Sequence, residues 1–430
     1  MLEEIAYTKK QVPEGVKDTL PREAARKRWL EDKLRKVFQS WGFKEIITPT
    51  FEYLDVLLTG WGGDSLENMY KFFDRQGRIL ALRSDVTTPV ARVMATKMKR
   101  YPRPLRLSYL ANLFRYDEPQ VGKQREFSQA GIELLGTCKP EADAEVIAIA
   151  IECFKAAGLT DFQISLGQVE FFRGVLDQTD LSELEKKNII LAVDRKDFLT
   201  LEKILANTSL SEEDKVLLNA VPQLYGKKEV LNKAQEKVAN QHSQKALDNL
   251  REVYQILEDY GLTDYIFIDF GLVRGIDYYT GIVFKVYTRG VGFSLGSGGR
   301  YNNLVKEFGE DCPAVGFALS LERTLYALEK KENLEISINN DCLLLFPPSL
   351  RSKAWCLAGK LRAKGLKVEL EVGERQLELL DEYAREREVN TLLILQSEEK
   401  AVLKFVDQDK VVELELKEGV DDEISQYCFA

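Results

Sequence analysis

The chain has 430 residues, of which 45% are apolar and 30% charged, so it is long enough for two or three domains with substantial cores. A net charge of −9 argues against broad binding of polyanions, which needs a local surplus of Lys and Arg. The single histidine, His242, lies in a polar stretch that predicts a solvated helix surface, which argues against Ser/His/Asp or Cys/His catalysis and against multi-histidine metal sites.

Six scattered cysteines without a CxxC pair predict reduced thiols in a cytoplasmic protein. No charged and then apolar leader opens the chain, and no apolar run approaches the roughly 20 residues that span a bilayer. We therefore expect no membrane association, no metal and no cofactor.

Residues 21–41 are predicted to form an amphipathic helix. Leu30, Leu34 and Phe38 recur at intervals of four residues, and Pro21 suits the first turn. Residues 43–57 then read as a strand that is interrupted within its length.

Pro49 interrupts this predicted strand and cannot donate to a ladder, so the strand is expected at an edge or an interface. An edge strand without any partner remains an alternative.

Short apolar segments separated by turn signals continue the pattern and predict an antiparallel sheet. They lie at 78–84, 105–115 and 127–136, and are followed by a predicted helix at 141–157 and a strand at 161–167.

Residues 169–261 are helical and charged in pattern and contain no catalytic motif, which favours a packing or partner-docking role. Strand signals resume at 265–273, 281–288 and 290–300, and a further helix is predicted from Ser320.

A polar stretch at 329–341 reads as a linker to a small α/β module with a parallel sheet. From residue 341 to 430, 13 Lys and Arg stand against 19 Asp and Glu, a net charge of −6. Such a charge disfavours RNA binding by this module.

Motifs that outline a pocket for an amino acid and a nucleotide occur in three separated parts of the chain. They are LRSDVTTPVAR at 82–92 with the stretch 113–136, then DFGLVRGIDYYTG at 269–281, and then GSGGRYNNL at 296–304 with AVGFALSLER at 314–323. Their order and spacing resemble the catalytic core of the histidyl-tRNA synthetases, which have a class II synthetase fold.

The resemblance implies an α+β fold with a class II aminoacyl-tRNA synthetase-like antiparallel sheet core, a helical insert and a small C-terminal α/β domain. The implied domains are a core in two parts, 1–168 and 262–328, an insertion at 169–261, and a module resembling an anticodon-binding domain at 341–430.

A bound histidine needs partners for its ammonium, its carboxylate and its imidazole. The resemblance places an acid and polar groups at the ammonium, a glutamate at the imidazole, an arginine at the carboxylate and tyrosines in the wall. These histidine-binding positions are Asp85, Thr87 and Gln129, then Glu133, then Arg274, and then Tyr278 and Tyr279.

Arg115, Arg125 and Arg323 match the arginines that hold triphosphate in class II synthetases, so they mark a vestigial nucleotide pocket. Between them, however, the sequence FRYDEPQ carries Asp117 and Glu118 where histidyl-tRNA synthetases show Glu and Arg. Replacing a positive by a negative charge opposes ATP binding.

With further departures in LRSDVT and SQAGIE, the chain resembles the regulatory subunits of ATP phosphoribosyltransferase, which are paralogues of the synthetases. The resemblance implies a non-catalytic subunit, required by a separate short catalytic chain in the first step of histidine biosynthesis and for feedback inhibition by histidine. It also implies a homodimer through the Pro49 region as the building block of a hetero-oligomer. No tRNA partner is expected.

Two other functions remain open. The chain could be an active histidyl-tRNA synthetase, since Arg115, Arg274 and Arg323 are retained, or a free-standing histidine sensor or adaptor. Histidine-dependent pyrophosphate exchange distinguishes the first, and copurification of a short phosphoribosyltransferase chain distinguishes the second.

Overall fold

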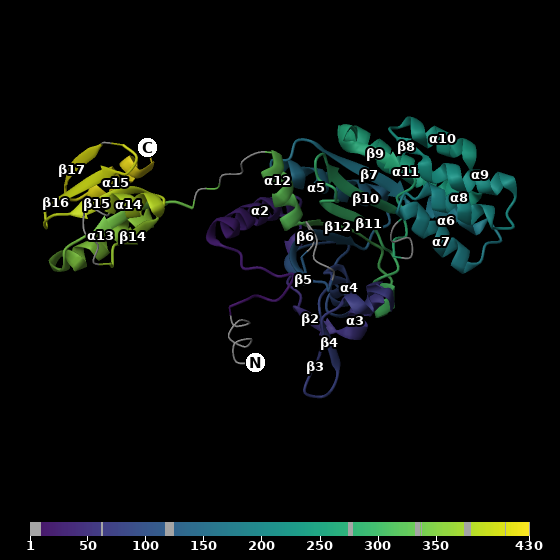
Figure 1. Cartoon of the computed structure of the whole chain (residues 1–430), viewed down its shortest axis with the longest axis horizontal. Helices are drawn as coiled ribbons and strands as arrows, with labels where there is room; N and C mark the ends of the chain where they lie inside the picture. The colour runs from purple at the N-terminus through teal and green to yellow at the C-terminus, as the bar shows by residue number, and fades with distance from the viewer. Residues whose placement is uncertain are drawn as a thin grey trace. The chain divides into compact units, whose positions relative to one another are not determined.

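The computed structural model divides the chain into two compact units, Met1–Leu334 and Glu335–Ala430, which are described separately here (Figure 1). The residues whose structure is described are 10–61, 63–116, 124–273, 278–331, 336, 338–373, 380–408 and 410–429.

A nine-stranded sheet with the order β1-β5-β6-β12-β11-β10-β7-β9-β8 forms the centre of the first unit. The run from β5 to β7 is antiparallel throughout, while β1 joins β5, and β9 joins β7, in parallel. The antiparallel core predicted from the sequence is therefore confirmed. The strands are β1 (Lys44–Glu45), β5 (Leu105–Phe114), β6 (Glu126–Leu135), β7 (Phe162–Gln168), β8 (Tyr225–Gly226), β9 (Ile266–Asp269), β10 (Ile282–Thr288), β11 (Gly296–Arg300) and β12 (Ala314–Ser320).

Helices α2 (Pro21–Ser40), α5 (Pro140–Ala156) and α12 (Leu321–Lys331) pack with this sheet. The predicted helix at 21–41 is confirmed, and Leu30, Leu34 and Phe38 are fully buried in the main core. Burying each such side chain stabilises the fold by roughly 1.5–3 kcal/mol.

A separate three-stranded sheet has the order β2-β4-β3, with β2 (Phe51–Tyr53), β3 (Lys71–Phe73) and β4 (Ile79–Leu82). The prediction of an antiparallel strand in 78–84 is therefore confirmed, but β4 does not share a sheet with β5 and β6 as expected. Helices α3 (Leu54–Trp61) and α4 (Thr87–Thr96) and the 3-10 helix η1 (Gly63–Asn68) accompany this sheet.

The prediction of a strand over 43–57 that Pro49 interrupts is only partly correct. The chain forms β1, passes Pro49 without strand pairing, forms β2 and becomes helical at Leu54. Helical geometry lets Leu54 and Leu57 face Met69 in one buried cluster, whereas strand alternation would place Leu54 and Leu57 on opposite faces.

Most helices of the insertion begin with a side-chain cap, as polar residues at a helix start favour. Ser182 and Glu185 form a capping box, and Asp197, Ser211 and Asn240 each accept a hydrogen bond at their helix start. The helices are α6 (Val169–Asp177), α7 (Glu183–Asp194), α8 (Phe198–Ala206), α9 (Glu212–Ala220), α10 (Glu229–Lys237) and α11 (Gln241–Asp259).

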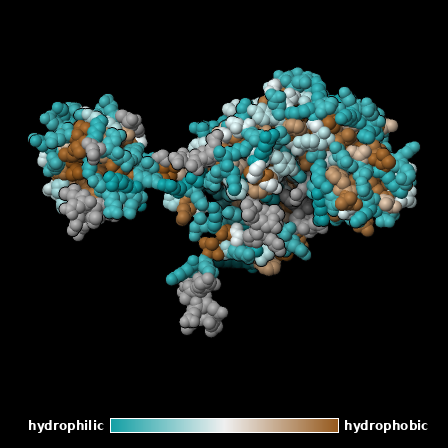
Figure 2. Space-filling view, turned by 45° about the horizontal axis from the view of Figure 1, so that its top comes forward, coloured by the Kyte–Doolittle hydropathy of each residue, from teal (hydrophilic) through white to brown (hydrophobic). Residues whose placement is uncertain are grey.

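The insertion is not purely helical, because β8 within it extends the central sheet beside β9. Its outer helices also carry exposed apolar side chains, and Figure 2 shows apolar patches on this part of the surface. Leu184, Leu199 and Val216 are 69%, 73% and 65% exposed.

Short 3-10 helices η2 (Val221–Gln223), η3 (Thr263–Tyr265) and η4 (Lys306–Phe308) complete the first unit.

The second unit has a five-stranded sheet with the order β14-β13-β15-β16-β17. The predicted parallel sheet is only partly correct, because β16 pairs antiparallel with both β15 and β17. The turn between β15 and β16 is too short for the crossover that parallel strands require. The elements are β13 (Asn340–Leu345), η5 (Pro348–Leu350), α13 (Arg351–Ala363), β14 (Val368–Leu370), α14 (Leu380–Glu386), β15 (Val389–Leu395), β16 (Lys400–Phe405), β17 (Val411–Glu415) and α15 (Val420–Phe429).

In the described part of the chain, no helix is both long and apolar enough to cross a membrane.

Candidate functional site

A cavity of about 1030 Å³ opens in the first unit between β5, β6, β10, β11 and β12, with the starts of α2 and α12 at its rim. Small-molecule sites typically measure about 300–1,000 Å³, so the cavity has room for more than one amino acid. Two groups of lining residues differ in character. We call Asp85, Thr87, Tyr109, Glu133, Tyr278, Tyr279 and Tyr301 the tyrosine end, and Lys17, Glu23, Arg26, Lys27, Glu322, Arg323 and Glu329 the charged end.

Glu133 lies at the centre of the tyrosine end and is only 1% exposed. The Thr87 hydroxyl donates to its Oε1 at 2.8 Å, and the Tyr301 hydroxyl donates to its Oε2. Burial raises the pKa of Glu133 to about 8, although both hydrogen bonds act in the opposite direction. Without a ligand, the neutral acid is therefore favoured at pH 7, and a ligand that donates N–H groups would favour the carboxylate.

Two glycines make room for this arrangement. A Cβ on Gly316, which is paired with Glu133 across β12 and β6, would lie 1.8 Å from Glu133 Oε2. A Cβ on Gly131 would lie 2.5 Å from the Tyr109 ring. No side chain fits at either position without moving a group of the tyrosine end.

The tyrosines pack on one another around Glu133. Tyr278 stacks on Tyr301 with ring centroids 5.5 Å apart and meets Tyr279 edge to face at 5.0 Å. Burial raises the pKa of Tyr279 to about 12 and raises those of Tyr109, Tyr278 and Tyr301 well above the usual value. All four hydroxyls therefore stay protonated and can donate hydrogen bonds.

Asp85 and Gln129 also line the cavity. The Asp85 Oδ2 accepts hydrogen bonds from the Thr88 N–H at 2.8 Å and the Thr88 hydroxyl at 2.9 Å, which fixes the carboxylate at the start of α4. Gln129 and Glu133 project from the same face of β6, because residues an even number apart share a face of a strand.

The structure thus brings together six of the seven positions predicted to bind histidine. The seventh, Arg274, lies outside the described residues, as do Asp117 and Glu118 of the predicted phosphate loop. Sequence reasoning missed Tyr109 and Tyr301. Tyr301 lies within the motif GSGGRYNNL at 296–304 that the sequence singled out, whereas nothing local distinguishes Tyr109 from a core residue of a strand.

The three arginines predicted to line a nucleotide pocket do not all lie in the cavity. Arg115 and Arg323 line the cavity, where Arg115 Nε donates to the Ser84 carbonyl at 3.0 Å and Arg323 Nη1 donates to the Ser294 carbonyl at 3.0 Å. Arg125 is not among the described lining residues, since it pairs with Glu14 at 3.4 Å and lies over the Tyr116 ring.

The charged end consists largely of ion pairs. Arg26 meets Glu329 at 2.7 Å, and Lys27 meets Glu322 at 3.3 Å. Six cations and six acidic side chains line the described part of the whole cavity. They are Lys17, Arg26, Lys27, Arg115, Lys285 and Arg323 against Glu23, Asp85, Glu126, Glu133, Glu322 and Glu329. Since Glu133 is favoured as the neutral acid, the surplus is one positive charge, which is little for a triphosphate.

Among the described residues, no group of three or more His, Cys, Asp or Glu side chains is arranged so that it could hold a metal ion.

Comparison with known families places the chain beside synthetases. A family model described as "Histidyl-tRNA synthetase" matches residues 15–324. Among relatives, the ATP phosphoribosyltransferase regulatory subunit of Acetivibrio thermocellus is 41% identical over 414 residues, which cover 96% of this chain and 99% of that protein. The protein of the same name from Thermoanaerobacter pseudethanolicus is 43% identical over 84% of this chain and 93% of its own.

Solved structures of proteins of these two kinds are also similar to this chain. The crystal structure titled ATP phosphoribosyltransferase regulatory subunit/histidyl-tRNA synthetase from Bacillus halodurans is 30% identical, with a TM-score of 0.81 over 90% of this chain and 99% of that one. A histidyl-tRNA synthetase from a Nostoc species is 26% identical, also with a TM-score of 0.81, over 97% of this chain and 99% of that one.

Proposed function

Since this chain belongs to the family of ATP phosphoribosyltransferase regulatory subunits, which have the fold of the histidyl-tRNA synthetases, we propose that it binds histidine and regulates a separate short phosphoribosyltransferase chain. In this role it is required for the activity of that catalytic chain in the first step of histidine biosynthesis. It also conveys feedback inhibition by histidine.

The contrast between the two ends of the cavity carries this proposal. The tyrosine end holds a buried acid in a cage of hydroxyl groups, which suits the N–H groups of an imidazole. The charged end holds cations that are already neutralised by carboxylates. A histidine site is thus retained while the charge needed to activate histidine with ATP is balanced out.

In the bound state, Glu133 forms a hydrogen bond with the imidazole of histidine. Its ammonium group is bound by Asp85, Thr87 and Gln129. Arg274 holds the carboxylate, and Tyr278 and Tyr279 close the wall. The chain is not itself an enzyme, and Arg115, Arg125 and Arg323 are remnants of a nucleotide site.

The building block of the assembly is a homodimer through the Pro49 region. In support, β1 lies at the edge of the central sheet, and Ile47 and Phe51 beside Pro49 are 87% and 51% exposed. An open strand edge with apolar neighbours favours pairing with a second copy. Histidine then inhibits by favouring one conformation of the mixed oligomer, so the substrates must weaken histidine binding in return.

Reconstitution tests the proposal. Phosphoribosyl transfer should appear only when the short catalytic chain is mixed with this chain, and histidine should inhibit the mixture. Glu133→Ala and Arg274→Ala should each weaken histidine binding by roughly 2–4 kcal/mol, measured by calorimetry, because each leaves a ligand group unpaired.

Three results would contradict the proposal. They are turnover by the purified chain alone, histidine-dependent pyrophosphate exchange at about 1 per second or faster, and histidine inhibition that survives both substitutions.

A further inference from the structure

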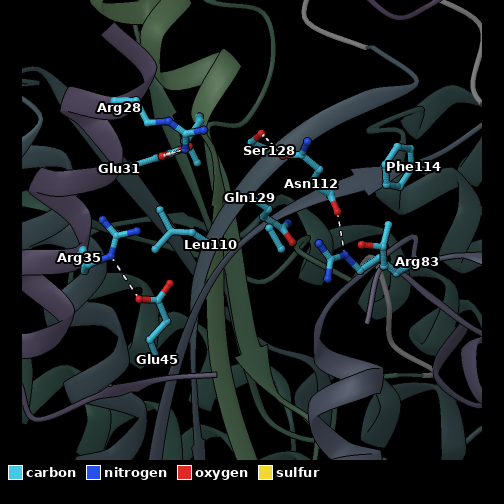
Figure 3. A pocket seen from close by; sticks show the side chains of 13 residues that line it. Arg28, Glu31, Arg35, Glu45, Arg83, Leu110, Asn112, Phe114, Ser128 and Gln129 are labelled. Atoms are coloured by element: carbon cyan, nitrogen blue, oxygen red, sulfur yellow. Dashed lines mark hydrogen bonds and ion pairs between the residues drawn. The ribbon is translucent and has the colours of Figure 1, made fainter. Parts of the chain in front are cut away.

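A second, smaller pocket of about 350 Å³ lies between α2, β1 and the strands β5 and β6 (Figure 3). Its charged lining residues are three arginines and two glutamates. Arg28 pairs with Glu31, and Arg35 Nε pairs with Glu45 at 3.2 Å, as the dashed lines in Figure 3 mark. One positive charge, that of Arg83, is left over.

Arg83 is only 7% exposed. Its Nε donates to the Asn112 carbonyl at 2.8 Å, and its Nη1 donates to the carbonyls of Thr48 at 2.8 Å and Pro49 at 3.3 Å. These bonds fix the guanidinium in place but supply no opposite charge.

Neither a carboxylate within 4.0 Å of Arg83 nor a hydrogen-bond partner for its Nη2 is found among the residues that the structure describes. The Glu52 carboxylate, whose charge acts on Arg83, is itself paired with Arg92 at 2.5 Å. A buried charge without a counter-charge costs several kcal/mol, so a site of this kind favours an added anion.

The other lining groups suit a small organic anion. Thr50, Asn112, Ser128 and Gln129 supply neutral polar groups, while Leu110 and Phe114 supply apolar surface. The volume lies at the lower end of the range for small-molecule sites, about 300 Å³, which limits the occupant to a compact molecule.

We propose that this pocket is a binding site for a small molecule that carries a carboxylate or phosphate group, held by the free edge of the Arg83 guanidinium. The site adjoins the proposed histidine site, since Gln129 lines both cavities, and it adjoins the Pro49 region that we propose as the dimer contact. The inference itself does not require histidine binding. A planar guanidinium with a fixed orientation is well suited to both anions.

Calorimetry on the full chain tests this, with inorganic phosphate and succinate titrated separately. We expect at least one of them to bind, and Arg83→Gln to weaken that binding about tenfold or more, the effect of losing one hydrogen-bonded charge. Leu110→Trp should abolish binding by filling the pocket while leaving Arg83 in place, which keeps the test decisive if Arg83→Gln fails to fold. Arg106→Gln is the matched control, since Arg106 on β5 is paired with Glu145 and does not line the pocket, and it should leave binding unchanged.

Three outcomes overturn the proposal. The first is that neither probe gives a heat of binding with the native chain. The second is that binding persists in both Arg83→Gln and Leu110→Trp. The third is that, in sedimentation, Arg83→Gln weakens self-association of a chain that binds neither probe, in which case a carboxylate of a second copy neutralises Arg83.

Discussion

The tyrosine end and the charged end of one cavity differ in how much a single side chain contributes to stability and to ligand binding. At the tyrosine end, Glu133 is almost fully buried, and each of its oxygens has a hydroxyl donor. At the charged end, Glu329 and Arg26 keep 47% and 29% of their side chains exposed. Burial makes each polar contact costly to lose, whereas solvent screens the exposed pairs. The comparison teaches that specificity for a ligand is concentrated where water is excluded.

The largest expected effect comes from Gly316→Ala at the tyrosine end. Its Cβ would lie 1.8 Å from Glu133 Oε2, so the carboxyl must move. We expect the free energy of unfolding to fall by about 3 kcal/mol, the upper part of the range for overpacking. Calorimetry should show histidine binding weakened by tenfold or more, on the order of one lost contact to a charged group.

Gly359→Ala is the matched control for this change. Gly359 lies in α13 of the second unit, and a Cβ there would meet nothing within 4 Å. The control should stabilise the fold by about 0.5–1 kcal/mol, the difference between Ala and Gly inside a helix. Equal destabilisation by both substitutions would show that the tyrosine end is no more tightly packed than an open helix face.

Next in size is the pH dependence that Glu133 confers. Its pKa rises from 4.5 to about 8 on folding, so the folded state holds more protons than the unfolded state between these values. The free energy of unfolding should therefore fall as pH rises from 4.5 to about 8. Urea unfolding at several pH values measures this slope, and Glu133→Gln should reduce it. A slope that is unchanged in Glu133→Gln would mean that other groups produce it.

Tyr301→Phe should have a smaller effect. It removes the hydroxyl that donates to Glu133 Oε2 but keeps the ring that stacks on Tyr278. We expect histidine binding to weaken by about 1 kcal/mol, the usual value of one hydrogen bond. The pH range over which stability falls should extend further upward, because the lost bond had lowered the pKa of Glu133. An unchanged upper limit of this range would argue against this bond.

The smallest effect is expected at the charged end. Arg26→Gln and Glu329→Gln remove the two partners of one exposed pair, and each should change the free energy of unfolding by less than about 1 kcal/mol. Histidine affinity should stay the same in both variants. A large loss of histidine binding in either would erase the contrast between the two ends.

The sequence by itself determined the features that depend on the spacing of residues close to one another in the chain. The helix of α2 follows from apolar residues one turn apart and from Pro21 in the first turn, and the strands β5, β6 and β7 follow from apolar segments between turn signals. Resemblance to the histidyl-tRNA synthetases singled out Thr87, Glu133, Tyr278 and Tyr279, which the structure brings to one cavity.

Only the tertiary structure decided what depends on pairing between distant segments. Thr87 and Tyr301 are 46 and 168 positions from Glu133, and the closeness of Gly316 to Glu133 depends on the register of β6 with β12. The antiparallel half of the second unit's sheet and the unpaired charge of Arg83 likewise arise from neighbours that no local pattern specifies. The physical reason is that periodicity fixes which face of an element is buried, whereas strand order and register fix what that face meets.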